Sequence, residues 1–322
     1  PDDTSSVEAA VKAVYRPWLE QGAVALQEAV AAGEFSTAYP VELPGPWAEK
    51  TCLLFSDGLR LDLAHRLRGQ LETLGLTTSV GTRLTALPSI TATSKPAVSP
   101  IADTLSGGER LDPVVLGGGP NVNIEVLGRQ LESGGYQVLK GVDTGDPNGR
   151  GWTELGDIDQ LGHLQPDKLA HLVDGEIREL AERIEALLKW GWEQVIVVTD
   201  HGWLLLPGGL PKADIPQHLT EAERTRKGRC ARLKELSNTD LQVVPWYWDA
   251  NVRIAIAPGI HCFEAGKTYE HGGLSPQECV TPVLTVSRVG PLGGEACSIG
   301  VRWQGLRCYF QLQNPPTVSL AD

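Results

Sequence analysis

Two apolar runs, each followed by an aspartate, constrain the fold of this chain more than any other feature. The first run, TCLLFS, leads into Asp57, and the second, EQVIVVT, leads into Asp200. After the first run, residues 59–74 have the apolar spacing of an amphipathic helix, and Thr77–Leu84 returns as a strand. A strand, a helix and a strand in this order predict a β-α-β unit and therefore a parallel sheet.

Further helices and strands are expected along the central part of the chain. Apolar residues on one stripe make 166–190 the clearest helix, and a short helix is expected over 90–99. Val252–Ala257 and Val280–Val286 have the composition of strands. Helices and strands alternate over this region, which is the pattern of an α/β fold.

Three segments depart from that pattern. Residues 101–124 and 142–156 are rich in Gly, Pro, Asp and Asn, which predicts long loops or lids over a site. Residues 214–235 are polar and basic, and we expect them to form an excursion from the sheet.

Changes in composition predict three parts. We expect residues 1–46 to form a helical lead-in from an upstream region, because apolar residues recur at helical spacing before a cluster of Pro and Gly. Residues 47–290 are expected to form the α/β domain. Residues 291–322 read as a β-rich tail that starts an accessory element.

Bulk composition excludes several classes of protein. The formal net charge of −12 argues against a basic body that grips nucleic acid by charge alone. No apolar run approaches the length needed to span a bilayer, so we expect no membrane contact. The six cysteines form no C-x-x-C pair, which favours buried thiols in a reducing cytoplasm over a zinc knuckle.

Acidic and histidine side chains gather where strands are predicted to end. Asp57 and the pair Asp200–His201 follow the two apolar runs. Ligands of open α/β sheets bind at the carboxyl ends of strands, so these side chains are expected to converge. Each has an ordinary alternative, since Asp57 could cap the following helix and Asp200–His201 could form a turn.

Three more residues complete a set of metal ligands. Asp159 and His163 are four residues apart, so one helical turn places both on one face, although Asp157 is an alternative ligand. His271 stands before two glycines. Three carboxylates and three imidazoles suit two zinc ions, with manganese or magnesium as alternatives. Such a pair of ions clamps the oxygens of a transferred phosphoryl group.

Four motifs in order give the chain a resemblance to a known family. They are Ser-Asp-Gly-Leu-Arg from residue 56, Leu-Pro-Ser-Ile-Thr from 87, Thr-Asp-His-Gly from 199 and His-Gly-Gly-Leu-Ser-Pro from 271. Together they resemble the PglZ domain of the alkaline phosphatase superfamily, found in BREX-type phage-defence systems. Gly58 departs from the alanine expected there. The resemblance covers roughly residues 50–287 and implies a mixed, mostly parallel sheet flanked by helices.

The resemblance also implies roles for individual residues. Asp57, Asp200 and His201 would hold one divalent ion. The second ion would be held by Asp159, His163 and His271.

The nucleophile and the phosphate contacts follow from the same resemblance. The superfamily uses a hydroxyl or thiol at the start of a helix after the second strand, where Thr91 fits and Ser89 stays an alternative. Arg60 and Lys95 are expected to contact phosphate.

These features predict a metal-dependent phosphoesterase. By the resemblance, we expect a phosphodiesterase acting on nucleotides or single-stranded oligonucleotides, with protein partners in a defence complex. The alternative is a non-catalytic scaffold subunit that keeps its metals for stability. A sulfatase is disfavoured because no C/S-x-P-x-R pattern occurs near residues 85–95. A mutase is disfavoured because the spacing leaves no room for its large inserted domain.

Overall fold

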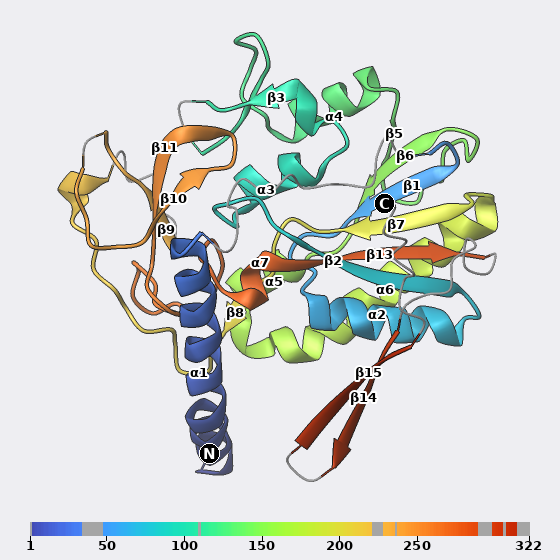
Figure 1. Ribbon diagram of the computed structural model, residues 1–322. Helices are drawn as coiled ribbons and strands as arrows, with labels where there is room; N and C mark the ends of the chain where they lie inside the picture. The colour runs from blue at the N-terminus through green and yellow to red at the C-terminus, as the bar shows by residue number, and fades with distance from the viewer. Residues whose placement is uncertain are drawn as a thin grey trace, which may run out of the picture.

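A six-stranded sheet forms the centre of the computed structural model, which describes residues 2–33, 48–108, 111–220, 228–235, 237–288, 298–304 and 307–313 (Figure 1). The strand order is β2-β13-β7-β1-β6-β5. β1 is parallel to β6 and β7, and β5 to β6, whereas β13 runs antiparallel to β2 and β7. The expected mixed, mostly parallel sheet is therefore confirmed. The strands are β1 (Thr51–Phe55), β2 (Thr77–Leu84), β5 (Gln137–Leu139), β6 (Arg150–Glu154), β7 (Gln194–Val198) and β13 (Val280–Ser287).

Helices cover both faces of this sheet (Figure 1). On β1, Cys52 and Leu54 point toward α2 and α6, whereas Leu53 and Phe55 point toward α3 and α4. Every residue of β1 is buried, which is typical of a strand covered on both faces in an α/β protein. The four helices are α2 (Leu61–Thr73), α3 (Thr91–Val98), α4 (Ile124–Ser133) and α6 (Leu169–Trp190).

The segment 142–156, expected to be a loop, contains the strand β6, so that expectation is wrong. β6 lies between β1 and β5, one position from the centre of the sheet. Only Trp152 among its five residues has a large apolar side chain, and it is fully buried against Phe55. Backbone pairing to two neighbouring strands specifies this strand, because its own side chains give too weak a signal.

A second, three-stranded sheet follows the order β10-β11-β9. The described residues of 214–235 lie outside the central sheet, as expected for an excursion, and they include β9 of this second sheet, with Cys230 and Ala231 buried. Residues 221–227 of the segment lie outside the described part of the chain. The strands are β9 (Cys230–Arg232), β10 (Val243–Trp246) and β11 (Asp249–Ile256).

The helix α1 (Asp2–Ala31) packs on the domain through its C-terminal half. Buried Gln27 donates hydrogen bonds to the carbonyl oxygens of Ala257, Gly259 and Leu274, at 3.3, 3.1 and 3.1 Å. None of the described helices is long and apolar enough to cross a membrane.

Short elements connect the larger ones. In the C-terminal region, β14 and β15 form an antiparallel pair. The division of the chain into residues 1–46, 47–290 and 291–322 stays a prediction. The remaining elements are η1 (Ala102–Thr104), β3 (Leu105–Ser106), β4 (Val114–Val115), α5 (Ile158–Leu164), η2 (Pro166–Lys168), β8 (Leu204–Leu205), η3 (Gln217–Leu219), β12 (Tyr269–Glu270), α7 (Pro276–Cys279), β14 (Ser298–Gln304) and β15 (Arg307–Gln313).

Candidate metal centre

Asp57 and Asp200 follow the carboxyl ends of two adjacent parallel strands. β1 and β7 are in register, with Phe55 opposite Val198, so the aspartates two residues beyond each strand meet. One carboxylate oxygen of Asp200, Oδ1, accepts hydrogen bonds from the backbone N–H groups of Gly58 and His201 at 3.4 and 3.0 Å. The strand ends therefore bring this pair together, as the sequence predicts.

One further oxygen of each aspartate is buried without a hydrogen bond. Oδ2 of Asp200 and Oδ1 of Asp57 have no hydrogen-bond partner among the residues that the structure describes. They lie 3.4 and 3.7 Å from Nε2 of His201. Buried carboxylate oxygens normally accept hydrogen bonds, and a divalent cation is the other way to stabilise them.

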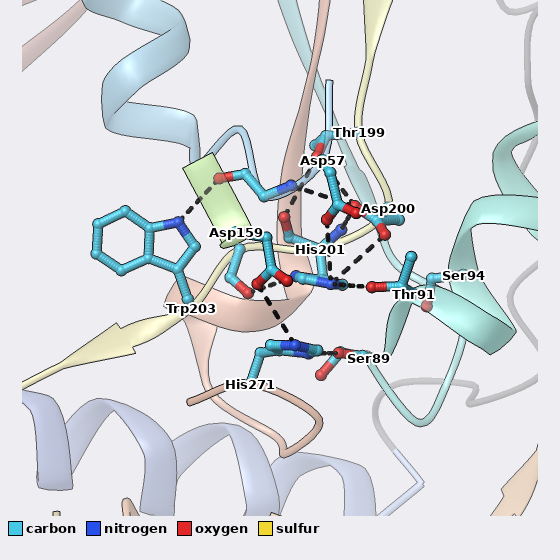
Figure 2. Close-up of polar contacts among 12 residues, drawn as sticks. Asp57, Ser89, Thr91, Ser94, Asp159, Thr199, Asp200, His201, Trp203 and His271 are labelled. Carbon is cyan, nitrogen blue, oxygen red and sulfur yellow. Dashed lines mark hydrogen bonds and ion pairs between the residues drawn. The ribbon is translucent and has the colours of Figure 1, made fainter. Parts of the chain in front are cut away.

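His201 and His271 present their Nε2 atoms to the cluster (Figure 2). Nδ1 of His201 lies 3.0 Å from the carbonyl oxygen of Gly202, and Nδ1 of His271 lies 3.0 Å from that of Ser89. A carbonyl only accepts, so each Nδ1 carries the proton and each Nε2 keeps its lone pair. This is the tautomer that metal-binding histidines adopt. The two rings stack with centroids 3.8 Å apart.

The short helix α5 contributes Asp159 and His163 on one face. Nε2 of His163 lies 3.5 Å from Oδ2 of Asp159 and 3.3 Å from Nε2 of His271. Asp157, the alternative ligand, is exposed on the protein surface. Asp159 is therefore the residue of this pair that joins the cluster.

All six predicted ligands lie together, and they fall into two groups. Asp57, Asp200 and His201 form the strand-end group, whose ligand atoms lie within 4.8 Å of one another. We call Asp159, His163 and His271 the helix–loop group. Its members are joined by the 3.3 and 3.5 Å contacts of His163 and by a contact of 3.5 Å between Nε2 of His271 and Oδ1 of Asp159.

The two groups are not fully separate, because some ligand atoms of one lie close to those of the other. His201 also lies with Asp159 and His271, and Glu270 lies with His163 and His271, in sets of atoms close enough for one ion. These oxygen and imidazole donors fit divalent zinc or manganese, although the assignment of each ligand to an ion stays a prediction.

The electrostatics of the cluster suit a cation. Burial, followed by the charge of Asp200, raises the pKa of Asp57 to about 7. Burial, followed by the charge of Asp159, raises the pKa of Asp200 to about 6. Burial alone would raise the pKa of Asp159 as well, but the nearby histidines and a hydrogen bond from Tyr269 lower it. Without a cation, Asp57 and Asp200 therefore ionise less readily than a free aspartate, whereas Asp159 ionises more readily.

Thr91 and Ser89 occupy different environments. Thr91 begins α3, and its hydroxyl oxygen lies 3.1 Å from Nε2 of His201. Ser89 is fully buried, and its hydroxyl donates to the carbonyl oxygen of Gly273 at 2.8 Å. Figure 2 shows the Thr91 hydroxyl directed at the imidazole and Ser89 beside His271. This geometry favours Thr91 over Ser89 as the nucleophile, a role that stays a prediction.

Lys95 and Arg60 are placed differently from each other. Lys95 lines a cavity of about 350 Å³ that also contains Asp57 and Asp159, and its ammonium group pairs with Glu154 at 2.6 Å. The guanidinium of Arg60 pairs with Asp62 and lies over the ring of Trp203. The cavity that Arg60 lines contains none of the six predicted ligands.

Gly58 has a positive φ of 71°, a conformation that favours glycine. A Cβ at this position would lie 3.2 Å from Cβ of Asp159. Glycine therefore suits this backbone better than the alanine that the resemblance leads us to expect.

Sequence reasoning missed two residues of the site. The hydroxyl of Tyr269 donates to Oδ1 of Asp159 at 2.8 Å, and Glu270 lies beside His163 and His271. Both belong to β12, which has only two residues and so shows no periodic pattern. Their position directly before His271 is the one signal that pointed to them.

No family model matches the sequence, and no curated protein matches it. Among solved structures, the chain is similar to murine ectonucleotide pyrophosphatase/phosphodiesterase 5, with 12% identity, a TM-score of 0.46, and coverage of 76% of this chain and 88% of that one. An inactive variant of that protein has been solved in complex with AMP (12% identity, TM-score 0.45, coverage 76% and 88%). Phosphonoacetate hydrolase from Sinorhizobium meliloti 1021, in complex with phosphonoacetate, is also similar, with 11% identity, a TM-score of 0.47, and coverage of 78% and 92%. We infer the function below from the geometry of the site itself.

Proposed function

We propose that this chain is a metal-dependent phosphoesterase of the alkaline phosphatase superfamily that binds two divalent ions. One observation carries the proposal. Asp57 and Asp200 each have one buried carboxylate oxygen without a hydrogen bond to any described residue, and both oxygens lie within 3.7 Å of Nε2 of His201, which keeps its lone pair. This arrangement is costly without a cation and stable with one.

The strand-end group would hold one ion and the helix–loop group the other. When bound, two such ions supply positive charge to phosphoryl oxygens and favour ionisation of a nearby hydroxyl. Zinc fits the donor set best, with manganese or magnesium as alternatives.

Thr91 is the proposed nucleophile. Its hydroxyl stands 3.1 Å from Nε2 of His201, beside the strand-end group. The Thr91 hydroxyl loses its proton and its oxygen attacks phosphorus, the bond to the leaving oxygen breaks, and the alkoxide that leaves takes up a proton to become the alcohol. Water then cleaves the phosphothreonine and regenerates the hydroxyl, so one water is consumed for each ester hydrolysed. Lys95 lines the cavity of about 350 Å³ that also contains Asp57 and Asp159. Its ammonium group is positioned to contact a phosphoryl oxygen when the ion pair with Glu154 opens.

We further propose that the substrate is a phosphodiester of nucleotide size. The cavity that contains Thr91, Asp159 and His271 measures about 420 Å³, which fits a small ligand or one nucleotide of a single strand. The net charge of −12 does not favour tight binding of a duplex. The four motifs that resemble the PglZ domain support a role in a BREX-like defence system, with protein partners in the cytoplasm.

Hydrolysis of bis-p-nitrophenyl phosphate tests the proposal. The protein is stripped with a chelator, and zinc, manganese or magnesium is added back separately. We expect no hydrolysis by the stripped protein, recovery with at least one metal, and a faster rate on the diester than on p-nitrophenyl phosphate. Tight binding of two ions with no hydrolysis of either ester would instead support the scaffold alternative. A faster rate on the monoester would overturn the diesterase assignment.

A further inference from the structure

A fully buried ion pair lies beside the metal centre without joining it. Arg229, which precedes β9, and Glu278, on α7, both have side chains with no exposed surface. Nε of Arg229 donates to Oε1 of Glu278 at 2.7 Å, and Nη2 donates to Oε2 at 3.0 Å. Burying two charges is costly, and a buried pair of this kind is weak evidence for stability alone.

Glu278 also holds the segment that follows His271. Its Oε1 accepts a hydrogen bond from the backbone N–H of Gly273 at 2.8 Å, and its Oε2 accepts one from the hydroxyl of Ser275 at 2.6 Å. Each carboxylate oxygen of Glu278 therefore accepts one hydrogen bond from Arg229 and one from the segment between β12 and α7. These are charge-assisted hydrogen bonds, which fix geometry more strongly than neutral ones.

Arg229 anchors the pair on the other side. It donates to the carbonyl oxygens of Gly259 and His261 at 3.0 and 2.6 Å. The same Gly259 carbonyl accepts from Gln27 of α1, which also bonds the carbonyl of Leu274. Gly273, Leu274 and Ser275 therefore each form a hydrogen bond with a buried side chain, that of Glu278 or Gln27.

This segment is connected to a proposed metal ligand by two further bonds. The carbonyl oxygen of Gly273 accepts from the hydroxyl of Ser89, and the carbonyl oxygen of Ser89 accepts from Nδ1 of His271 at 3.0 Å. Glu278, Gly273, Ser89 and His271 therefore form one continuous chain of contacts. The bond on Nδ1 sets both the tautomer and the direction of the ring.

We propose that Arg229 and Glu278 are positioning residues for His271, and through it for the helix–loop group. The proposal rests on the metal-binding function proposed above. The ion pair fixes Gly273, Gly273 and Ser89 fix the ring of His271, and the ring directs Nε2 at the ion. Removing the pair should weaken the helix–loop site while leaving the strand-end site intact. Glu278 reaches His201 only through its backbone carbonyl oxygen, which accepts from the N–H of Gly202 at 2.9 Å and is kept in the variant.

The test is a calorimetric titration of the stripped 322-residue chain with zinc. The variant Arg229→Met/Glu278→Leu replaces the pair with apolar side chains of similar size, which avoids leaving one buried charge unpaired. We expect two sites in the unsubstituted protein and, in the variant, a loss of about 10- to 100-fold in affinity at one site only. The kcat for a diester should fall by a similar factor, with a smaller change in KM.

A matched control is Arg183→Met, which removes another largely buried arginine. Arg183 donates to the carbonyl of Asp143 and the hydroxyl of Thr153, at 2.5 and 3.2 Å, outside the segment 271–278. We expect it to lower the melting temperature and leave both zinc affinities unchanged. If the double variant does not fold, Glu278→Gln replaces it, since this substitution keeps the shape and weakens the hold on Gly273. The same selective loss is then expected.

The outcomes separate the two proposals. If the unsubstituted protein binds none of zinc, manganese and magnesium in parallel titrations, the proposed function fails. If it binds two ions and the variant binds both with unchanged affinity, or loses both equally, the positioning role is overturned while the function stands.

Discussion

The two proposed ligand groups are built in different ways. The strand-end group comes from residues directly after two adjacent strands of the central sheet, and Asp200 and His201 have no exposed side-chain surface. The helix–loop group comes from the seven-residue helix α5 and from the segment after β12, and the side chain of His163 is 37% exposed. The sheet itself places the ligands of the strand-end group. The helix–loop group is positioned by hydrogen bonds from residues outside the group.

This difference predicts unequal metal affinity. A site assembled on rigid elements loses little order when it binds an ion, whereas a site on a short helix and a loop must be fixed by its surroundings. We therefore expect the strand-end group to bind its ion more tightly. Substitutions in one group should then change metal binding at that group more than at the other.

The largest effect is expected for Asp200→Ala. It removes a fully buried ligand of the strand-end group, and hydrolysis should fall below detection. The fold should stay intact, because a strand-end ligand contributes to metal affinity more than to core packing. Activity and circular dichroism are the measurements, with Asp167→Ala, which changes an exposed carboxylate on η2, as the control. Full activity of Asp200→Ala would reject the assignment.

Thr91→Ala should lower kcat by at least ~100-fold, because the proposed attacking oxygen is lost. Metal content and melting temperature should stay close to those of the unsubstituted protein, since Thr91 is only partly buried and is not a proposed ligand. Ser89→Ala is the comparison. It removes the hydrogen bond to Gly273 but keeps the carbonyl that bonds His271, so kcat should fall less, together with metal affinity at the helix–loop group. A nearly active Thr91→Ala would point to water as the nucleophile, and a dead Ser89→Ala with unchanged metal affinity would point to Ser89.

A smaller effect is expected for Tyr269→Phe, which acts on the helix–loop group. The substitution removes the hydrogen bond to Asp159 and keeps the ring that packs against His163. Affinity at that group should fall by about 10-fold, with the strand-end group unaffected. Competition titration with a zinc chelator measures both sites. An equal loss at both would show that the groups are not separate.

The smallest effect concerns pH and stability. In metal-free protein, Asp57 keeps its proton up to a pKa of about 7, whereas the unfolded chain releases it near 3.8. The folded state therefore binds more protons between these values, and the free energy of unfolding falls as pH rises from about 4 to 7. Stripped protein should lose melting temperature over this range.

Metal-loaded protein should lose less, because a cation stabilises the ionised carboxylates. Asp57→Asn should flatten the profile of the stripped protein by removing this contribution. A stripped protein whose melting temperature rises steadily over the same range would contradict the electrostatic account.

The strand-end group could be predicted from the sequence because it depends on local patterns. The apolar runs before Asp57 and Asp200 predicted β1 and β7, and parallel pairing made their ends meet. The spacing of four between Asp159 and His163 predicted that both lie on one face of a helical turn, and α5 contains that turn. In these cases, the information needed lies within a few residues.

The rest depends on contacts between distant residues. β6 was missed because Arg150–Glu154 contains one large apolar residue and is specified by pairing on both sides. The hydrogen bond from Tyr269 to Asp159 spans 110 residues, and the ion pair of Arg229 and Glu278 spans 49. Cys230–Arg232 likewise became a strand by pairing with β11. No local pattern encodes such partners.

Anomalous diffraction at the zinc edge, from crystals of the stripped protein soaked in zinc, tests the two-metal claim most directly. We predict two peaks, one about 2 Å from ligand atoms of Asp57, Asp200 and His201, and a second at the same distance from Asp159, His163 and His271. At limiting zinc, the peak at the strand-end group should fill first. A single peak, or none within coordination distance of these residues, would contradict the account.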